Sequence, residues 1–280
     1  MRRRYHMEEQ ELAAAEAAGA NREPVEPRPA AGVVLSRDVP GGPEVLLVRR
    51  RPDVGFAAGA YVFPGGTLDA EDADSAWKPS LDEPPAAAVA GAADADGHPA
   101  RSFVVAALRE LFEETGVLLT TRASLASAEL ATARSALVRG ERGFREIVSG
   151  LNVRLAGDRL LLCARWITPE SISRRYDARF FLAEAPREVQ VAPELGELVE
   201  HVWVSPREAL ERYNAHEFPM LFPTAVTLGW LETSNSMAEW FEHFLAKEIT
   251  PILPRLRRID GQVVPLMPGE PGYDDKGGDG

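Results

Sequence analysis

Three glutamates in one short segment carry the clearest chemical signal in this sequence. The segment from Arg109 to Gly116 reads R-E-L-F-E-E-T-G, so Glu110, Glu113 and Glu114 stand at positions i, i+3 and i+4. On a helix, residues at this spacing share one face. The ordinary explanation of such a cluster is a solvated acidic surface, and the alternative is a group of oxygen ligands for a cation.

The helix itself disfavours acids at these positions. Like charges four residues apart, as in Glu110 and Glu114, cost about 0.2–0.5 kcal/mol, and acids at the negative end of the helix dipole lose about 0.3–1 kcal/mol each. Only Arg109, four residues before Glu113, offsets this locally. The cluster therefore predicts an arriving cation, and a hard ion such as Mg²⁺ is held by one or two carboxylates together with substrate phosphates.

A second feature is the run Phe63-Pro64-Gly65-Gly66, which follows a short apolar segment that we predict to be a strand. Glycine lets the chain turn tightly and lets carbonyl groups and a phosphate approach the backbone closely. Pro-Gly-Gly is also an ordinary turn, so its pairing with the acidic helix is what points to a site.

The elements that must position these residues are mixed strands and helices. Apolar runs at 31–36 and 44–49 flank a Pro-Gly-Gly-Pro turn and predict a β-hairpin. The acidic segment ends a helix predicted to begin at an N-cap, Ser102, and to stop at Gly116. Further strands are predicted at 160–167, 179–182 and 199–204, and helices at 122–150 and, after the N-cap Ser205, on to about 258.

One enlarged domain accounts for most of the 280 residues. We place it at 29–258, between a flexible N-terminal tail (1–28) and a flexible C-terminal tail (259–280). Within it, the Ala- and Pro-rich stretch of about 73–100 shows little periodicity and predicts an insertion or long loop. A helical C-terminal extension is expected over about 206–258.

Composition excludes several classes of protein. A net charge of −12 offers no basic field to a nucleic-acid backbone, which disfavours binding to duplex nucleic acid. No run approaches the roughly 18 apolar residues of a membrane span, and the basic start leads into acidic residues in place of an apolar signal segment. We therefore expect a soluble, cytoplasmic protein that does not bind membranes. The sequence is compatible with a homo-oligomer. The five histidines form no zinc spacing, and the single cysteine, Cys163, is predicted to lie in a buried strand.

The acidic segment and the glycine run together resemble the signature of the Nudix hydrolase superfamily. The matching residues are Gly66, Arg109, Glu110, Leu111, Glu113, Glu114, Gly116 and Val117. Two features differ from the usual signature: Asp72 stands at its first acid position in place of Glu, and the gap from there to the Arg-Glu pair is much longer. The long gap looks like the branch that includes the peroxisomal coenzyme A diphosphatases and their bacterial relatives, which the segments 174–181 and 203–210 also resemble.

The resemblance implies a fold and a set of roles. The fold is an α/β/α sandwich with a mixed central β-sheet, helical insertions and a helical C-terminal region. Glu113 and Glu114 would bind Mg²⁺ or Mn²⁺ together with the carbonyl of Gly65. Glu110 would bind a further metal ion or act as general base, and Arg109 would orient a carboxylate.

Two acids outside the helix also receive an expectation. Members of the family often add one acid from a distant loop, and of Glu194, Glu197 and Glu200 we choose Glu197 as a metal ligand. Asp72 is one methylene shorter than the usual acid and precedes the long insertion, so it is expected to be peripheral.

Arginines supply candidate contacts to substrate phosphates. They follow the strand at 44–49 and precede the strand at 179–182, and with the glycine of the turn the candidates are Arg49, Arg50, Arg51, Gly66, Arg174 and Arg175, with Arg179 in the second cluster. An equally good explanation is that these arginines only protect the ends of strands. The spacing from Leu46 through Arg50 to the Phe-Pro-Gly-Gly run resembles a coenzyme A signature of bacterial Nudix enzymes, whereas Val48, Arg51 and Gly55 depart from it.

These observations predict a Mg²⁺-dependent diphosphatase that cleaves a nucleoside diphosphate linked to another group, with coenzyme A or acyl-coenzyme A as one candidate. ADP-ribose or NADH is the alternative substrate. A non-catalytic Nudix-like domain that senses a nucleotide, and a plain α/β domain with an acidic helix, are the alternatives from other classes. Loss of the glutamates would favour a sensor, and all three are present.

Overall fold

A single mixed sheet organises the chain, for which the computed structural model describes residues 5–7, 11, 25–53, 57–94, 97–121, 125–192, 198–259 and 262–274. Its strands are β1 (Arg28–Val39), β2 (Gly42–Arg50), β3 (Tyr61–Val62), β4 (Gly65–Thr67), β5 (Leu161–Ile167), β6 (Tyr176–Glu184) and β7 (Leu198–Val204). Their order is β3-β2-β1-β6-β5, with β4 also paired to β1 and β7 to β2. β1 and β6 run parallel, and the other pairs are antiparallel.

The sheet divides beside the turn that carries the glycines. β1 and β2 pair with each other only from Ser36 to Val45, at their hairpin end. Beyond it β2 pairs with β3 and β1 pairs with β4, so the segment 61–67 lies between the two diverging strands. The carbonyl of Pro64 accepts a hydrogen bond from the backbone of Val33 at 2.9 Å, which fixes the turn on the central strand.

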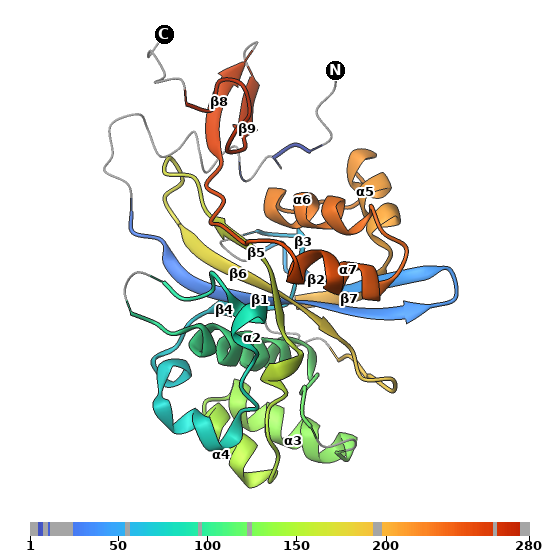
Figure 1. Ribbon diagram of the computed structural model, residues 1–280. Coiled ribbons are helices and arrows are strands. Elements are labelled where there is room, and N and C mark those ends of the chain that lie inside the picture. Colours follow the sequence, from blue (N-terminus) through green and yellow to red (C-terminus); the bar gives the residue numbers. More distant parts are fainter. Residues whose placement is uncertain are drawn as a thin grey trace.

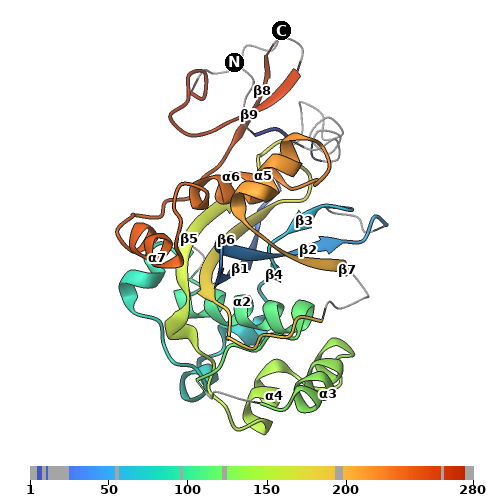
Figure 2. The same ribbon diagram turned by 90° about the vertical axis from the view of Figure 1, so that its right-hand side faces the viewer.

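Helices cover both faces of the sheet, which confirms the predicted α/β/α architecture (Figure 1). One side carries α2 (Ala100–Thr115), with α3 (Ser127–Val138) and α4 (Phe144–Gly150) beyond it. The other side carries α5 (Pro206–Asn214), α6 (Phe222–Leu231) and α7 (Met237–Leu245), as the view turned by 90° shows (Figure 2). None of the helices in the described ranges is both long and apolar enough to cross a bilayer.

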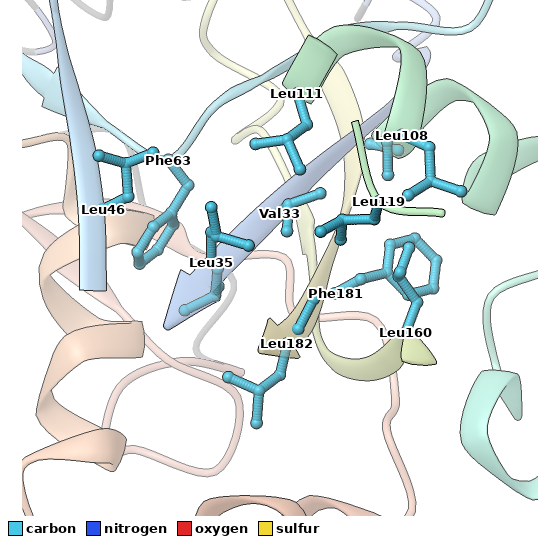
Figure 3. Packing of buried hydrophobic residues seen from close by; sticks show 14 of the residues in the cluster. Val33, Leu35, Leu46, Phe63, Leu108, Leu111, Leu119, Leu160, Phe181 and Leu182 are labelled. Atoms are coloured by element: carbon cyan, nitrogen blue, oxygen red, sulfur yellow. The ribbon is translucent and has the colours of Figure 1, made fainter. Parts of the chain in front are cut away.

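The core explains why β1 is apolar along most of its length. Its residues from Ala31 to Ser36 are all buried, because helices lie on both faces of this central strand. Figure 3 shows side chains of β1, β2 and β6 packing with Leu108 and Leu111 of α2. The same burial places Cys163 inside the sheet, as predicted, and raises the pKa of its thiol to about 12.

Helix α2 differs from its prediction at the start and agrees with it at the end. It begins at Ala100, with Pro99 at the N-cap, so the predicted cap at Ser102 is wrong. Ser102 is fully buried in the first turn, where its backbone N–H donates to the carbonyl of Pro99 at 2.9 Å. Its side-chain oxygen is buried and makes no capping hydrogen bond. Gly116 ends the helix with a φ of 76°, and its N–H donates to Phe112 at 2.9 Å, as predicted for a left-handed cap.

Short 3₁₀ helices make up the segment between β4 and α2: η1 (Ala70–Ala73), η2 (Ser75–Ser80) and η3 (Ala86–Val89). Isolated large side chains attach this segment to the rest of the protein. Because they are not regularly spaced, the sequence shows no periodic pattern here. Trp77 is fully buried against Phe144 of α4, with ring centroids 5.4 Å apart. A fourth 3₁₀ turn, η4 (Gly157–Arg159), leads into β5.

Both predicted tails contain packed residues. Met7 is buried, and the ring of His6 stacks on Tyr213 of α5 with centroids 4.1 Å apart. Near the other end, β8 (Arg255–Ile259) and β9 (Gln262–Leu266) form an antiparallel hairpin, where the sequence predicted a helix to 258 and then a tail. The sequence does contain a signal for this hairpin, because Asp-Gly stands between the paired residues Ile259 and Gln262.

Candidate active site

Close backbone contact joins the glycine turn to the acidic face of α2. The N–H of Gly65 donates to Oε2 of Glu114 at 2.9 Å. A Cβ added at Gly66 would lie 2.4–2.7 Å from the carboxylate of Glu110, and one added at Gly65 would lie 2.6 Å from the carbonyl oxygen of Ala31. Position 65 therefore requires glycine, because backbone atoms occupy the space of a Cβ, whereas a Cβ at Gly66 would displace the Glu110 carboxylate from its contact with Arg109.

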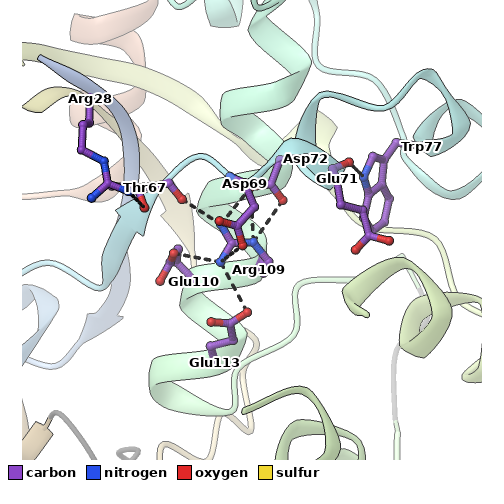
Figure 4. Close-up of polar contacts among 9 residues, drawn as sticks. All are labelled: Arg28, Thr67, Asp69, Glu71, Asp72, Trp77, Arg109, Glu110 and Glu113. Atoms are coloured by element: carbon purple, nitrogen blue, oxygen red, sulfur yellow. Dashed lines mark hydrogen bonds and ion pairs between the residues drawn. The ribbon is translucent and has the colours of Figure 1, made fainter. Parts of the chain in front are cut away.

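Arg109 is the centre of the site's charge network (Figure 4). Its guanidinium is almost completely buried and reaches outward to α2's own acids, with Nη1 2.8 Å from Oε1 of Glu110 and 3.4 Å from Oε1 of Glu113. Its Nη2 donates to the carbonyl of Thr67 in β4 at 2.8 Å. One cation thus fixes two of the three glutamates and ties the helix to the glycine-containing strand.

Asp72 completes this network, which corrects the expectation that it is peripheral. Its side chain is 1% exposed and accepts from Nη2 and Nε of Arg109 at 2.8 and 3.0 Å. It also accepts from the backbone N–H of Asp69 at 2.9 Å, which closes the η1 turn. The long insertion follows η1, so its length does not move Asp72 away from α2. Asp72 therefore fixes the position of Arg109, which in turn holds the glutamates of α2.

We predict that Asp72→Asn destabilises the fold. The substitution removes the carboxylate from a buried, bidentate pair and leaves Arg109 undercompensated, so the free energy of unfolding should fall by about 2 kcal/mol or more. Asp69→Asn is the matched control, because Asp69 is 64% exposed and lies 3.7 Å from the same guanidinium. Urea denaturation measures both variants, and equal midpoints would show that the Asp72 contact contributes no more than a surface ion pair.

Burial and charge set the protonation of the acids on α2. Burial raises the pKa of Glu110 to about 7; the cation of Arg109 opposes this rise and the charge of Glu113 adds to it. Burial also raises the pKa of Glu113. Four carboxylates, those of Asp69, Asp72, Glu110 and Glu113, lie within 3.7 Å of the Arg109 guanidinium, so this one cation faces more acids than it can neutralise.

The donor set fits a hard divalent cation bound together with substrate. Glu110, Glu113 and Glu114 line one cleft with Gly65 and Gly66 and supply only oxygen ligands from their side chains. Among the described residues, no group of three or more acidic, histidine or cysteine side chains that could hold a metal ion is present. Mg²⁺ is usually bound by one or two carboxylates together with substrate phosphates, so these acids would hold it in the presence of substrate.

We predict that Mg²⁺ affinity of the isolated protein rises with pH. Below pH 7 Glu110 holds a proton in the folded state, which the cation must displace, so the apparent affinity should increase between about pH 5.5 and 7 and then level off. Glu110→Gln should flatten this dependence, whereas Glu129→Gln, on the exposed start of α3, should leave it intact. Isothermal titration calorimetry with Mg²⁺ measures it, and a pH-independent affinity in the unmodified protein would contradict the assignment.

The cleft that contains these acids has a volume of about 950 Å³. Of the predicted substrate-binding residues it includes Arg50, Gly66 and Arg174. It also includes Arg28, which the sequence assigned to the tail and which donates to Oγ1 of Thr67 at 3.4 Å. The signal that could have found Arg28 is its position at the start of the strand that pairs with the glycine segment.

The other predicted arginines have partners elsewhere. Arg49 donates to the carbonyl of Gly59 at 3.1 Å, and Arg51 forms an exposed ion pair with Asp53 at 2.8 Å. Neither belongs to the set of described residues that lines the cleft.

The alternation of side chains along β6 explains why the arginines of the second cluster do not all reach the cleft. Along this strand Tyr176, Ala178 and Phe180 line the cleft, so alternate residues point to the opposite face. Arg179 is fully buried on that face, 2.9 Å from Asp177 and over the ring of Phe103. Just before β6, Arg175 is buried and donates to the carbonyls of Thr168 and Val25, so it joins backbone segments.

The predicted distant acid, Glu197, lies outside the described residues. Its neighbour in the sequence, Glu200, belongs to β7 and accepts hydrogen bonds from the Tyr61 hydroxyl and from Arg49. These contacts hold Glu200 beside β3.

A family model described as the NUDT19 Nudix domain matches residues 79–231, which is more than half of the chain. The chain belongs to this Nudix hydrolase family. The human acyl-coenzyme A diphosphatase NUDT19 is 29% identical over an alignment that covers 88% of this chain and 76% of the human protein. The protein of the same name from Xenopus laevis is 24% identical, with coverage of 82% and 71%. A crystal structure of a Nudix hydrolase from Alicyclobacillus acidocaldarius is 28% identical and superposes with a TM-score of 0.62, covering 78% of this chain and 96% of that one.

The match to the NUDT19 type agrees with the long gap between the first acid of the signature and its Arg-Glu pair. In this NUDT19-type chain the described residues between Asp72 and Arg109 include η2, η3 and the first part of α2. The signature acids nevertheless meet the glycine turn, because Asp72 precedes the extra residues and stays bonded to Arg109.

Proposed function

We propose that this NUDT19-type Nudix hydrolase cleaves the diphosphate of coenzyme A and its acyl derivatives. One observation carries the proposal: a single cleft joins the acidic face of α2 to Arg28, Arg50 and Arg174. The acids supply a place for a divalent cation and the diphosphate, and the arginines supply cations for a further phosphate such as the 3′-phosphate of coenzyme A. The acyl-coenzyme A diphosphatase name of the human relative supports the same substrate class.

The residues of the chain divide the work of hydrolysis. Glu113, Glu114 and the carbonyl of Gly65 are the proposed Mg²⁺ or Mn²⁺ ligands, with Glu110 nearby. When bound, the cation neutralises charge on the diphosphate and favours ionisation of water. Arg109 keeps the carboxylates of Glu110 and Glu113 in place through hydrogen bonds to both.

Glu110 is the proposed general base. Water attacks one phosphorus, its proton passes to the carboxylate, and the anhydride P–O bond to the second phosphate breaks. The carboxylate of Glu110 lines the cleft beside Gly66, where it can accept a proton from an attacking water. Coenzyme A would yield adenosine 3′,5′-bisphosphate and 4′-phosphopantetheine.

A substrate panel tests the proposal. Values of kcat/KM with Mg²⁺ are compared for coenzyme A, octanoyl-coenzyme A, ADP-ribose, NADH and diadenosine polyphosphates, because specificity is a ratio of these values. Coenzyme A compounds should exceed ADP-ribose and NADH at least tenfold. A tenfold preference in the opposite direction would reject the proposed substrate, and tight nucleotide binding without turnover would indicate a sensor.

Arg50 provides a sharper test of the same assignment. Arg50→Ala should raise KM for coenzyme A more than for dephospho-coenzyme A, because only the former carries the 3′-phosphate. Arg51→Ala is the matched control, since this neighbour pairs with Asp53 on the surface. Equal changes in KM for the two substrates would remove Arg50 from that role.

A further inference from the structure

The end of the cleft away from the acids of α2 is lined mainly by apolar side chains, with Glu11 beside them. A hydrophobic cluster separate from the main core consists of Met7, Ala164, Trp166, Ile172, Phe222 and Val226. Four of its members, Met7, Trp166, Ile172 and Phe222, line the cleft that also contains the acids of α2. The proposed hydrolysis of a diphosphate uses none of these four side chains.

Elements from both ends of the chain build this apolar end. Met7 comes from the N-terminal segment, and Phe222 begins α6, where its backbone N–H donates to Glu11 at 3.2 Å. The hairpin contributes Leu256 of β8 and Pro265 of β9 to the same lining. The rings of Trp166 and Phe222 meet edge to face with centroids 6.0 Å apart. Parts of the segments that were predicted to be flexible tails therefore line the cleft.

The sheet register gives the distance between the two ends. Thr67 of β4 pairs with Ala30 of β1, Ala30 with Ala178 of β6, and Ala178 with Trp166 of β5. All four residues line the cleft. The two in the middle are alanines, whose small side chains leave space above the sheet. Three steps between neighbouring strands span roughly 14 Å.

This span matches the arm of coenzyme A. About twelve bonds separate the phosphate oxygen of the pantetheine arm from its sulfur, which equals four backbone residues and an extended length of about 14 Å. With a diphosphate beside β4 and α2 and the arm extended across the strands along this register, the sulfur and the acyl group on it would lie at Trp166.

We propose that the apolar end of the cleft binds the acyl chain of an acyl-coenzyme A and that Leu256 limits the length of that chain. This inference rests on the proposed function, since it needs the diphosphate at α2. The enzyme then prefers acylated over free coenzyme A. Each methylene buried there should raise kcat/KM by up to about fourfold, until the chain reaches the hairpin.

The test compares chain lengths and a variant that shortens the site. Values of kcat/KM are measured for free, acetyl-, butanoyl-, octanoyl- and palmitoyl-coenzyme A. The ratio of octanoyl- to free coenzyme A should be at least tenfold, and Leu256→Trp should reduce that ratio at least fivefold. Ile259→Trp is the matched control on the same strand, because Ile259 is 41% exposed and lies outside the cleft lining; it should leave the ratio unchanged.

Binding measurements distinguish a failure of this inference from a failure of the proposed function. Calorimetry with the Glu114→Gln variant gives the Kd of octanoyl- and free coenzyme A, and the acylated compound should bind more tightly by a similar ratio. Turnover of coenzyme A without any dependence on chain length overturns the acyl site alone. An equal loss for free and acylated substrate in Leu256→Trp overturns it as well, because that end would then hold the nucleoside. Absence of turnover and binding for every coenzyme A compound overturns the proposed function and this inference together.

Discussion

Glu114→Gln is expected to lower kcat at least on the order of 10²-fold, the scale of one lost electrostatic contact in a transition state. Glutamine keeps the size of the side chain and can still accept the Gly65 N–H, which lies 2.9 Å from Oε2. The fold should therefore survive while the negative charge offered to Mg²⁺ is lost.

Steady-state kinetics with saturating Mg²⁺, together with thermal unfolding, measures this effect. Glu146→Gln is the control, because that glutamate pairs with Arg142 on the surface of α4. Undiminished hydrolysis by a folded Glu114→Gln protein would remove Glu114 from the metal site. Full activity of the unmodified protein in excess chelator would remove the metal itself from the mechanism.

Arg109→Gln should produce the largest loss of stability, about 3 kcal/mol or more. The change leaves the buried carboxylate of Asp72 without its cation and removes the hydrogen bonds to Glu110 and Glu113. Arg109→Lys should recover only part of the loss, because an ammonium group cannot reproduce the bidentate geometry.

Urea denaturation at neutral pH tests this prediction against Arg142→Gln. Arg142 makes an i, i+4 ion pair with Glu146 at 2.7 Å, but both side chains are well exposed, so its loss should cost less than about 1 kcal/mol. Comparable midpoints for Arg109→Gln and Arg142→Gln would show that the network does not hold η1 and β4 on the helix.

The parts of the site that the sequence predicted are those with local signals. The acidic face of α2 follows from helical spacing, its end from Gly116, and the close approach of the turn from Gly65 and Gly66. A residue's neighbours along the chain determine each of these features. The family resemblance added the expectation that helix and turn meet.

Contacts between distant segments account for what the sequence did not predict. Asp72 meets Arg109 across 37 positions, and nothing local in either segment indicates it. The burial of Arg179 could have been inferred from the alternation along β6, which places Tyr176, Ala178 and Phe180 on the opposite face. The arginine-rich β8 was missed because charge obscured its pairing with β9.

The central position of β1 has a consequence for biosynthesis. Its parallel partner β6 lies roughly 150 residues later in the chain, so the ribosome releases β1 long before that partner exists. Until then the run Val33-Val34-Leu35 offers an open, uncharged strand edge that invites pairing with other chains. Nascent chains and truncations that end before Tyr176 should therefore aggregate more readily than chains that include β6.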